Sequence, residues 1–130
     1  GLGLAEALTH SDPIRRFARP TAQPNLWVIP AGVPTPESML ASDRMRLRIT
    51  ELRSEFDFVL LDSPAMSLAN DAISMASFSD GAVLVLKANS SKRTAAKQAV
   101  EEMQAGKAVV LGAVLNQRRY PIPQKLYDWL

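Results

Sequence analysis

Residues 55–65 read EFDFVLLDSPA, and this stretch decides how the chain is interpreted. Apolar residues fill positions 58–61, Asp62 follows them, and Ser63 and Pro64 come next. A short run that is apolar throughout, rather than alternating with polar residues, is typical of a strand buried on both faces of a parallel sheet. The stretch therefore predicts a buried strand over residues 56–62 that ends on a carboxylate.

Other runs of the same kind occur along the chain. They are LWVIP at 26–30, GAVLVLK at 81–87 and AVVLGAVLN at 108–116. Each is nearly free of polar residues, so each predicts a further strand of a parallel sheet.

Helical patterns lie between these runs. Residues 35–56 carry an apolar stripe at helical spacing, with Thr35 as the predicted N-cap and Pro36 at the first helical position. The stripe consists of Met45, Ile49, Leu52 and Phe56. The arginine-rich sides of residues 44–53 predict a solvated face, with an interaction face as the alternative. Further helices are expected over 4–8, from about 70 to 76, and from Ser90 or Ser91 to Gly106.

Alternation of strands and helices at this spacing indicates βαβ units. The predicted fold class is α/β, with three layers around a mostly parallel sheet. The length of 130 residues suits one domain, residues 1–130, of which 117–130 form a C-terminal tail. In that tail, Tyr127 and Trp129 are expected to pack back on the domain as a hydrophobic anchor.

Composition excludes several classes of function. The chain has no cysteine and one histidine, His10, which argues against disulfides, a zinc site and a Ser-His-Asp triad. A net charge of +2 gives no indication of a nucleic-acid partner. No apolar run approaches the ~20 residues that a membrane-crossing helix needs. A cytoplasmic protein is expected.

Ligands of open α/β sheets bind beyond the carboxyl ends of the strands. Asp62 stands at such an end, in the pattern of a Walker B strand, where the carboxylate holds Mg²⁺ through water against the phosphates of a nucleotide. The structural alternative is a turn, because aspartate commonly caps turns. Residues 30–32, 87–89 and 116–119 follow the other strands and are expected on the same rim.

The ordered motifs resemble a known family. IPAG, FDFVLLDSPA, NDA, DGAVLVLKANSSKRT and LGAVLN are similar, in order and spacing, to the later part of the bacterial tyrosine kinases of capsule and exopolysaccharide synthesis. Those kinases are P-loop ATPases with a deviant Walker A motif, related to MinD and ParA. The resemblance runs from about residue 4 to residue 116.

The resemblance implies roles for individual residues. Asp62 corresponds to the Walker B aspartate that binds Mg²⁺, and Ser63 and Pro64 match the residues that follow it, whereas Ala65 replaces a second proline. Asn116 corresponds to the asparagine near the adenine, and Arg118 flanks the base. Asp71, in NDA, matches a family aspartate but is interpreted first as a helix N-cap. Lys87, Arg93 and Thr94 follow the family pattern and are interpreted as surface or cap residues.

The phosphate-binding motif of the family is missing from this chain. Its P-loop, Gly-x-x-x-x-Gly-Lys-Ser/Thr, would hold the phosphates through backbone N–H groups and a lysine, and no such sequence occurs here. In the family this motif and the Walker A′ strand come before the part that matches. The predicted sheet is therefore incomplete, Mg-ATP is expected to bind only with the missing half, and the chain is expected to be inactive alone.

Two functions follow from the resemblance. The first is the C-terminal portion of a Mg-ATP-dependent tyrosine-kinase-like ATPase of exopolysaccharide or capsule synthesis or export. The second is a non-catalytic relative that serves as an interaction module. The implied partners are ATP, a transmembrane polysaccharide co-polymerase or adaptor that would bring the protein to the inner face of the cell membrane, and a further copy of the chain. Tyr120 and Tyr127 are the tyrosines of the tail, where the family has a phosphorylated cluster. An α/β protein of unrelated function is the third, weaker interpretation.

Overall fold

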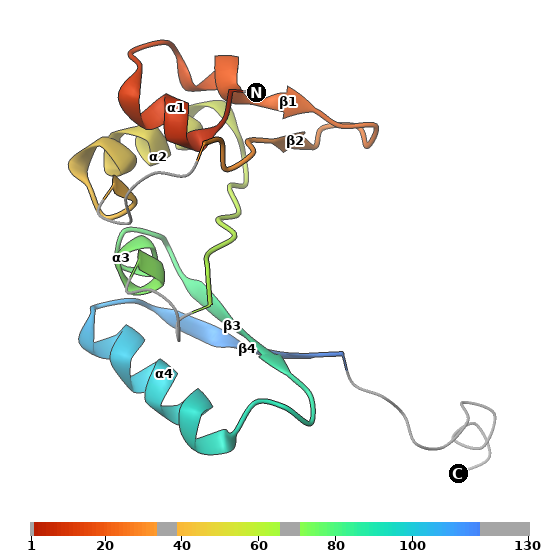
Figure 1. The fold of residues 1–130 in the computed structure, drawn as a ribbon, viewed down its shortest axis with the longest axis vertical. Coiled ribbons are helices and arrows are strands. Elements are labelled where there is room, and N and C mark those ends of the chain that lie inside the picture. The colour runs from red at the N-terminus through yellow and green to blue at the C-terminus, as the bar shows by residue number, and fades with distance from the viewer. Residues whose placement is uncertain (1, 34–38, 66–70, 118–130) are drawn as a thin grey trace, which may run out of the picture. The chain divides into compact units, whose positions relative to one another are not determined.

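A computed structural model describes residues 2–33, 39–65 and 71–117 (Figure 1). The chain divides into two compact units, Gly1–Met75 and Ala76–Leu130, and each is described here by itself. Within the described residues, no helix combines the length and the hydropathy needed to cross a membrane.

The first unit is built around three short helical segments. They are α1 (Leu4–Thr9), the 3₁₀ helix η1 (Ile14–Phe17) and α2 (Asp43–Glu55). Their apolar sides meet in one core, in which Phe17, Ile14 and Met45 are the largest fully buried side chains. The helix predicted over residues 4–8 is thus confirmed.

Helix α2 begins later than the sequence pattern predicts. It starts at Asp43, where the Ser42 hydroxyl accepts a hydrogen bond from the N–H of Met45 at 3.3 Å. The predicted start near residue 35 is wrong because Ser42 is an N-cap that satisfies one of the open N–H groups of the first turn. Thr35 and Pro36 themselves lie outside the described residues. The apolar stripe is confirmed, with its first three members buried and Phe56 half-buried.

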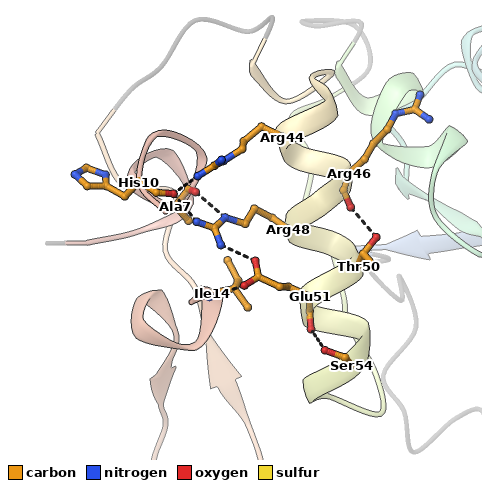
Figure 2. Close-up of polar contacts among 9 residues, drawn as sticks. All are labelled: Ala7, His10, Ile14, Arg44, Arg46, Arg48, Thr50, Glu51 and Ser54. Carbon is orange, nitrogen blue, oxygen red and sulfur yellow. Dashed lines mark hydrogen bonds and ion pairs between the residues drawn. The ribbon is translucent and has the colours of Figure 1, made fainter. Parts of the chain in front are cut away.

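A buried arginine joins α2 to the C-terminal end of α1 (Figure 2). Arg48 is only 5% exposed, and its Nε donates to the carbonyl of Ala7 at 2.8 Å. Its Nη2 donates to the carbonyl of His10 at 2.5 Å, and its Nη1 pairs with Glu51 Oε2 at 2.5 Å. Carbonyls at a helix C-terminus lack partners inside the helix and lie at the negative end of its dipole, so a guanidinium stabilises them.

Other polar groups extend this arrangement. Arg44 also donates to the carbonyl of His10, and Glu51 Oε1 accepts from the N–H of Ile14 at 3.4 Å (Figure 2). The predicted solvated arginine face of α2 is therefore wrong for Arg48, whose guanidinium is an internal connector. It lies one residue before the buried Ile49, and this position next to the apolar stripe is the signal that could have shown it.

The first predicted strand forms, but in a different kind of sheet. β2 (Trp27–Val28) pairs antiparallel with β1 (Arg19–Pro20), with Arg19 opposite Val28. The turn between them places Asn25 at a φ of 61°, a conformation that asparagine tolerates. Trp27 is half-buried and Val28 is exposed. The prediction that residues 26–30 form a strand buried in a parallel sheet is wrong, because Trp27 and Val28 pair antiparallel with Pro20 and Arg19 and neither of their side chains is buried.

The loop after β2 is fastened to the start of α1. Leu4 and Ala5 donate backbone hydrogen bonds to the carbonyls of Pro30 and Ala31, at 2.8 and 2.9 Å. The chains approach so closely that a Cβ on Gly3 would lie 2.5 Å from the carbonyl oxygen of Pro30. Gly32 has a φ of 84°, which favours glycine.

Glu6 completes this contact. Its Oε2 accepts from the N–H of Gly3 at 2.7 Å and its Oε1 from the N–H of Val33 at 3.1 Å. These hydrogen bonds, first from Val33 and then from Gly3, hold the pKa of the Glu6 carboxyl below its ordinary value. Glu6 thus caps α1 and holds the loop with one carboxylate. A glutamate three residues after the cap position is the sequence signal for half of this role.

The second unit contains the parallel part of the sheet. β3 (Ala82–Lys87) and β4 (Val110–Asn116) pair in parallel, with Val85 opposite Val114 and Lys87 opposite Asn116. The strands predicted at 81–87 and 108–116 are confirmed, and so is their parallel order. The connection between them is α4 (Arg93–Ala105), which packs against β4 (Figure 1).

Helix α4 ends where the sequence predicts. Gly106 is its C-cap and donates to the carbonyl of Glu102 at 2.9 Å. The left-handed residue is the next one, Lys107, with a φ of 65°. The helix predicted near residue 70 is α3 (Asp71–Ser77). The interpretation of Asp71 as the N-cap is wrong, because Asp71 is itself helical, in the first turn of α3, and it is buried.

We predict that Arg48→Met lowers the free energy of unfolding by about 2–3 kcal/mol, because it leaves the carbonyl of Ala7 without a donor and the Glu51 carboxylate without its charged partner. The partial exposure of Glu51 keeps the loss below that of a fully buried pair. Urea unfolding followed by circular dichroism measures the change. Arg16→Met is the control, since Arg16 makes an exposed ion pair with Asp12 and should change stability by less than about 0.5 kcal/mol. Equal losses in the two variants would contradict the connector role.

We also predict that Glu6 makes stability depend on acid. Its folded-state pKa is below the ordinary glutamate value of 4.5, so its contribution is complete above that value and disappears as pH falls through the lowered pKa. Urea midpoints of the wild-type chain and Glu6→Gln should therefore differ most near neutral pH and converge in acid. Glu101→Gln, which removes an exposed pair with Lys97, serves as the control. A difference that grows in acid would refute the assignment.

Candidate functional site

The segment that carries Asp62 leaves α2 through Phe56. The N–H of Phe56 donates to the carbonyl of Leu52 at 2.9 Å, and extended backbone begins at this C-cap. The Phe56 ring lies 6.3 Å from the ring of Trp27, at 59° to it. Arg15 lies over both rings, with its guanidinium carbon 4.7 Å from the Trp27 centroid, and it pairs with Glu55 at 2.9 Å. This cluster anchors the beginning of the segment to η1 and β2.

Residues 58–61 do not form the predicted strand in this structure. Phe58 is 90% exposed and Leu60 is 96% exposed, whereas Val59 and Leu61 are half-buried. The prediction of a strand over 56–62 is wrong for the chain as described, because no strand among the described residues pairs with this segment. A parallel strand depends on neighbours for its backbone hydrogen bonds, and it cannot form alone.

The residues after this segment are open to solvent. Asp62, Ser63 and Pro64 are exposed, and the Ser63 hydroxyl donates to the carbonyl of Pro64 at 3.2 Å. The described residues contain no group of three or more acidic or histidine side chains that could hold a metal ion. Mg²⁺ commonly takes one or two carboxylates and fills its remaining positions with water and phosphate oxygens. The single carboxylate of Asp62 therefore fits Mg²⁺ bound through water together with a phosphate.

The carboxyl ends of β3 and β4 lie side by side. Lys87 and Asn116 are register partners, and Ala88 donates to the carbonyl of Asn116 at 2.8 Å. The side-chain oxygen of Asn116 accepts from the N–H of Gln117 at 2.8 Å. The prediction that the residues following these two strands lie on one rim is confirmed for the described residues. Asn116 lies beside the first residues of the loop that leads from β3 to α4.

The remaining residues that the sequence singled out lie in different parts of the chain. Arg118, Tyr120 and Tyr127 lie outside the described residues. Arg93 and Thr94 are exposed in the first turn of α4, where Lys92 is the N-cap. The loop at residues 30–32 belongs to the first unit with Asp62, and its carbonyls at Pro30 and Ala31 accept hydrogen bonds from α1.

Comparison with known proteins gives the same family as the motifs. No family model matches the chain. It is 32% identical over 117 residues to the tyrosine-protein kinase CpsD of Streptococcus agalactiae, covering 88% of this chain and 51% of that protein. It is 32% identical over 111 residues to the putative tyrosine-protein kinase CapB of Staphylococcus aureus, covering 84% of this chain and 47% of that one.

The chain is a homologue of the bacterial tyrosine-protein kinases. A third relative is the tyrosine-protein kinase YwqD of Bacillus subtilis, 26% identical over 120 residues, or 91% of this chain and 51% of YwqD. The chain thus spans about half the length of these three relatives.

The fold of the chain is similar to part of a kinase domain. Its structure matches the crystal structure of the VpsO kinase domain with a TM-score of 0.83 at 21% identity, over 91% of this chain and 59% of that domain. The predicted α/β class is thereby confirmed, and β3 and β4 supply a parallel pair of strands.

Sequence reasoning missed the residues that hold the site's surroundings in place. Arg15 lies over two aromatic rings at the start of the Asp62 segment, a contact that its own sequence context does not predict. No local pattern reveals this contact, because Arg15 and Phe56 are far apart in the sequence. The position of Arg48 next to the apolar stripe of α2 is a weak sequence signal for its burial. The position of Glu6, three residues after the N-cap of α1, is a stronger signal for its capping role.

Proposed function

We propose that this chain is part of a Mg-ATP-dependent tyrosine-kinase-like ATPase of capsule or exopolysaccharide synthesis or export. The observation that carries the proposal is the match to CpsD and CapB over more than four-fifths of the chain. The exposed position of Asp62 after an apolar segment supports it. The single partial domain, residues 1–130 with the tail 117–130, remains a prediction.

In the proposed site, each residue has a limited task. Asp62 would hold Mg²⁺ through water, and the metal would neutralise charge on the transferred phosphoryl group. Ser63 and Pro64 would fix the turn that presents the carboxylate. Asn116 would offer a donor and an acceptor to the base edge once its amide leaves the N–H of Gln117, and Arg118 would flank the base.

The phosphate-binding part of the site must come from outside these 130 residues, because the sequence contains no P-loop. Phosphate groups supply charge-assisted hydrogen bonds, the strongest contacts that a nucleotide makes. Asp62 and Asn116 without that cradle would bind a nucleotide weakly.

The second candidate is an interaction module without catalysis. It is favoured by the missing P-loop and by the apolar side chains that the strands of the second unit expose. In both cases we propose a cytoplasmic protein that reaches the inner face of the membrane through a transmembrane co-polymerase or adaptor, with a homo-oligomer as a further assembly. The coding sequence before Gly1 distinguishes the kinase-like ATPase from the interaction module, since a P-loop encoded there supports the kinase.

We predict that this chain alone shows no micromolar binding of Mg-ATP in isothermal titration calorimetry, because the phosphate contacts are absent. A micromolar dissociation constant would overturn the account of the missing cradle.

With the phosphate-binding half supplied, Asp62→Asn should lower Mg²⁺ affinity and ATP turnover by roughly 10–100-fold, as expected for a residue that orients a metal through water. Asp57→Asn is the matched control, because Asp57 is exposed in the same segment and should have little effect. Equal effects of the two substitutions would remove Asp62 from the site.

A further inference from the structure

The turn between β3 and α4 is closed on Lys87 by a serine. The Ser91 hydroxyl accepts a hydrogen bond from the N–H of Lys87 at 3.0 Å, and the N–H of Ser91 donates to the carbonyl of Lys87, also at 3.0 Å. The N–H of Ser90 reaches the same carbonyl at 3.3 Å. Asn89 supplies the left-handed residue of this turn, with a φ of 59°. Ser91 thus holds the last residue of β3 through both its hydroxyl and its main chain.

The peptide group that joins Lys87 to Ala88 extends this contact to β4. Its carbonyl belongs to Lys87 and its N–H to Ala88, and that N–H donates to the carbonyl of Asn116 at 2.8 Å. The group is planar and trans, so its carbonyl and its N–H point in opposite directions from one rigid plane. A change in the turn at Ser91 therefore also changes the direction of the N–H that holds Asn116.

A second peptide group extends the contact to the Asn116 side chain. Its carbonyl belongs to Asn116 and accepts from Ala88, and its N–H belongs to Gln117 and donates to Asn116 Oδ1 at 2.8 Å. Because a backbone N–H only donates, the side-chain atom that faces it is assigned as the oxygen. A continuous series of hydrogen bonds thus runs from the main chain of Ser91 to the amide of Asn116, and bonds in such a series polarise one another.

We propose that Ser91 is a positioning residue for Asn116. The turn that Ser91 closes sets, through the two peptide groups, the direction in which the Asn116 amide presents its NH₂ group at the rim. The proposal rests on the proposed function, in which Asn116 contacts the base of the nucleotide, and it adds a residue that controls the choice of base. An amide held in one direction discriminates between purines because adenine carries an amino donor where guanine carries a carbonyl acceptor.

Ser90 provides a matched comparison within the same turn. Ser90 and Ser91 are both exposed, and both donate to the Lys87 carbonyl through their main chain. The Ser90 hydroxyl, however, makes no hydrogen bond to any residue that the structure describes. Replacing either serine with alanine removes the same atom, so a difference between the two variants measures the contact of the Ser91 hydroxyl with Lys87.

The first test uses the full 130-residue chain and amide hydrogen exchange followed by NMR. Ser91→Ala should speed exchange at the amides of Lys87, Ala88 and Gln117 by roughly 3–10-fold, as expected when one hydrogen bond of the series is lost. The same substitution should shift the side-chain amide signals of Asn116, because the direction of that group changes.

Controls distinguish this effect from a general loosening of the sheet. The amide of Ala82, which donates to Val109 at the opposite end of the strands, should exchange at the wild-type rate. Ser90→Ala should change none of these rates, and Ser91→Thr, which keeps the hydroxyl, should restore them. Faster exchange at Lys87 alone, or equally at Ala82, would overturn the proposal.

The second test measures turnover of ATP and of GTP with the phosphate-binding half supplied. Ser91→Ala should lower the preference for ATP by roughly threefold or more, whereas Ser90→Ala should leave it unchanged. In an Asn116→Ala background, Ser91→Ala should change the preference no further, because a positioning residue acts only through the residue that it positions. An equal effect of Ser91→Ala in both backgrounds would overturn the proposal.

The two tests separate the positioning role of Ser91 from the nucleotide role of Asn116. If the NMR signals respond to Ser91→Ala but Asn116→Ala leaves the preference for ATP unchanged, the nucleotide role fails and the positioning by Ser91 is supported. If the signals of Ala88, Asn116 and Gln117 do not respond, the positioning role is refuted, whatever the choice of base.

Discussion

The first unit depends on one buried guanidinium. Arg48 reaches from the middle of α2 to two carbonyls at the end of α1, and Glu51 neutralises its charge. A six-residue helix is too short to be stable alone, so α1 persists because its two ends are held from outside. Glu6 and the loop at residues 30–33 hold one end, and Arg48 holds the other. The start of the segment that leads to Asp62 is attached to the same framework through Arg15 and Phe56.

The two units differ in the size of the apolar side chains that they bury. The first buries large side chains such as Phe17 and Met45 against one another. The second buries mainly alanines and Met103, while the strand residues Val83, Val85 and Val114 stay exposed. Apolar burial is the main favourable term in folding, so the second unit lacks much of the stabilisation that its sequence could provide.

Periodicity in the sequence predicted elements whose partners lie nearby. β3, α4 and β4 were predicted almost to the residue, because a βαβ unit brings its own partners together and Gly106 marks the helix end. Residues 26–30 and 56–62 have the same apolar pattern, yet the first contributes to an antiparallel hairpin and the second pairs with no strand in the described part of the chain. An apolar run in the sequence predicts a strand, but it does not show which strand will pair with it, because the partner lies elsewhere in the chain. The role of Asp62 stays a prediction from its place after an apolar run, whereas no local pattern reveals the contacts of Arg15 with Trp27 and Phe56.

The close approach of Gly3 to residues 30–32 has a consequence for how the sequence can change. A side chain at Gly3 would meet backbone atoms at 2.5 Å, and one at Gly32 would meet the Glu6 carboxylate at 2.2 Å while requiring a left-handed backbone. A larger residue at either position cannot be compensated by trimming the other, since both are already glycine. At Gly3 the conflict is with backbone atoms, so no shorter side chain elsewhere relieves it and only a rearrangement of the loop could accommodate a larger residue. At Gly32 the nearest atom is the end of the flexible Glu6 side chain, which can move, so the lasting cost there is the left-handed backbone.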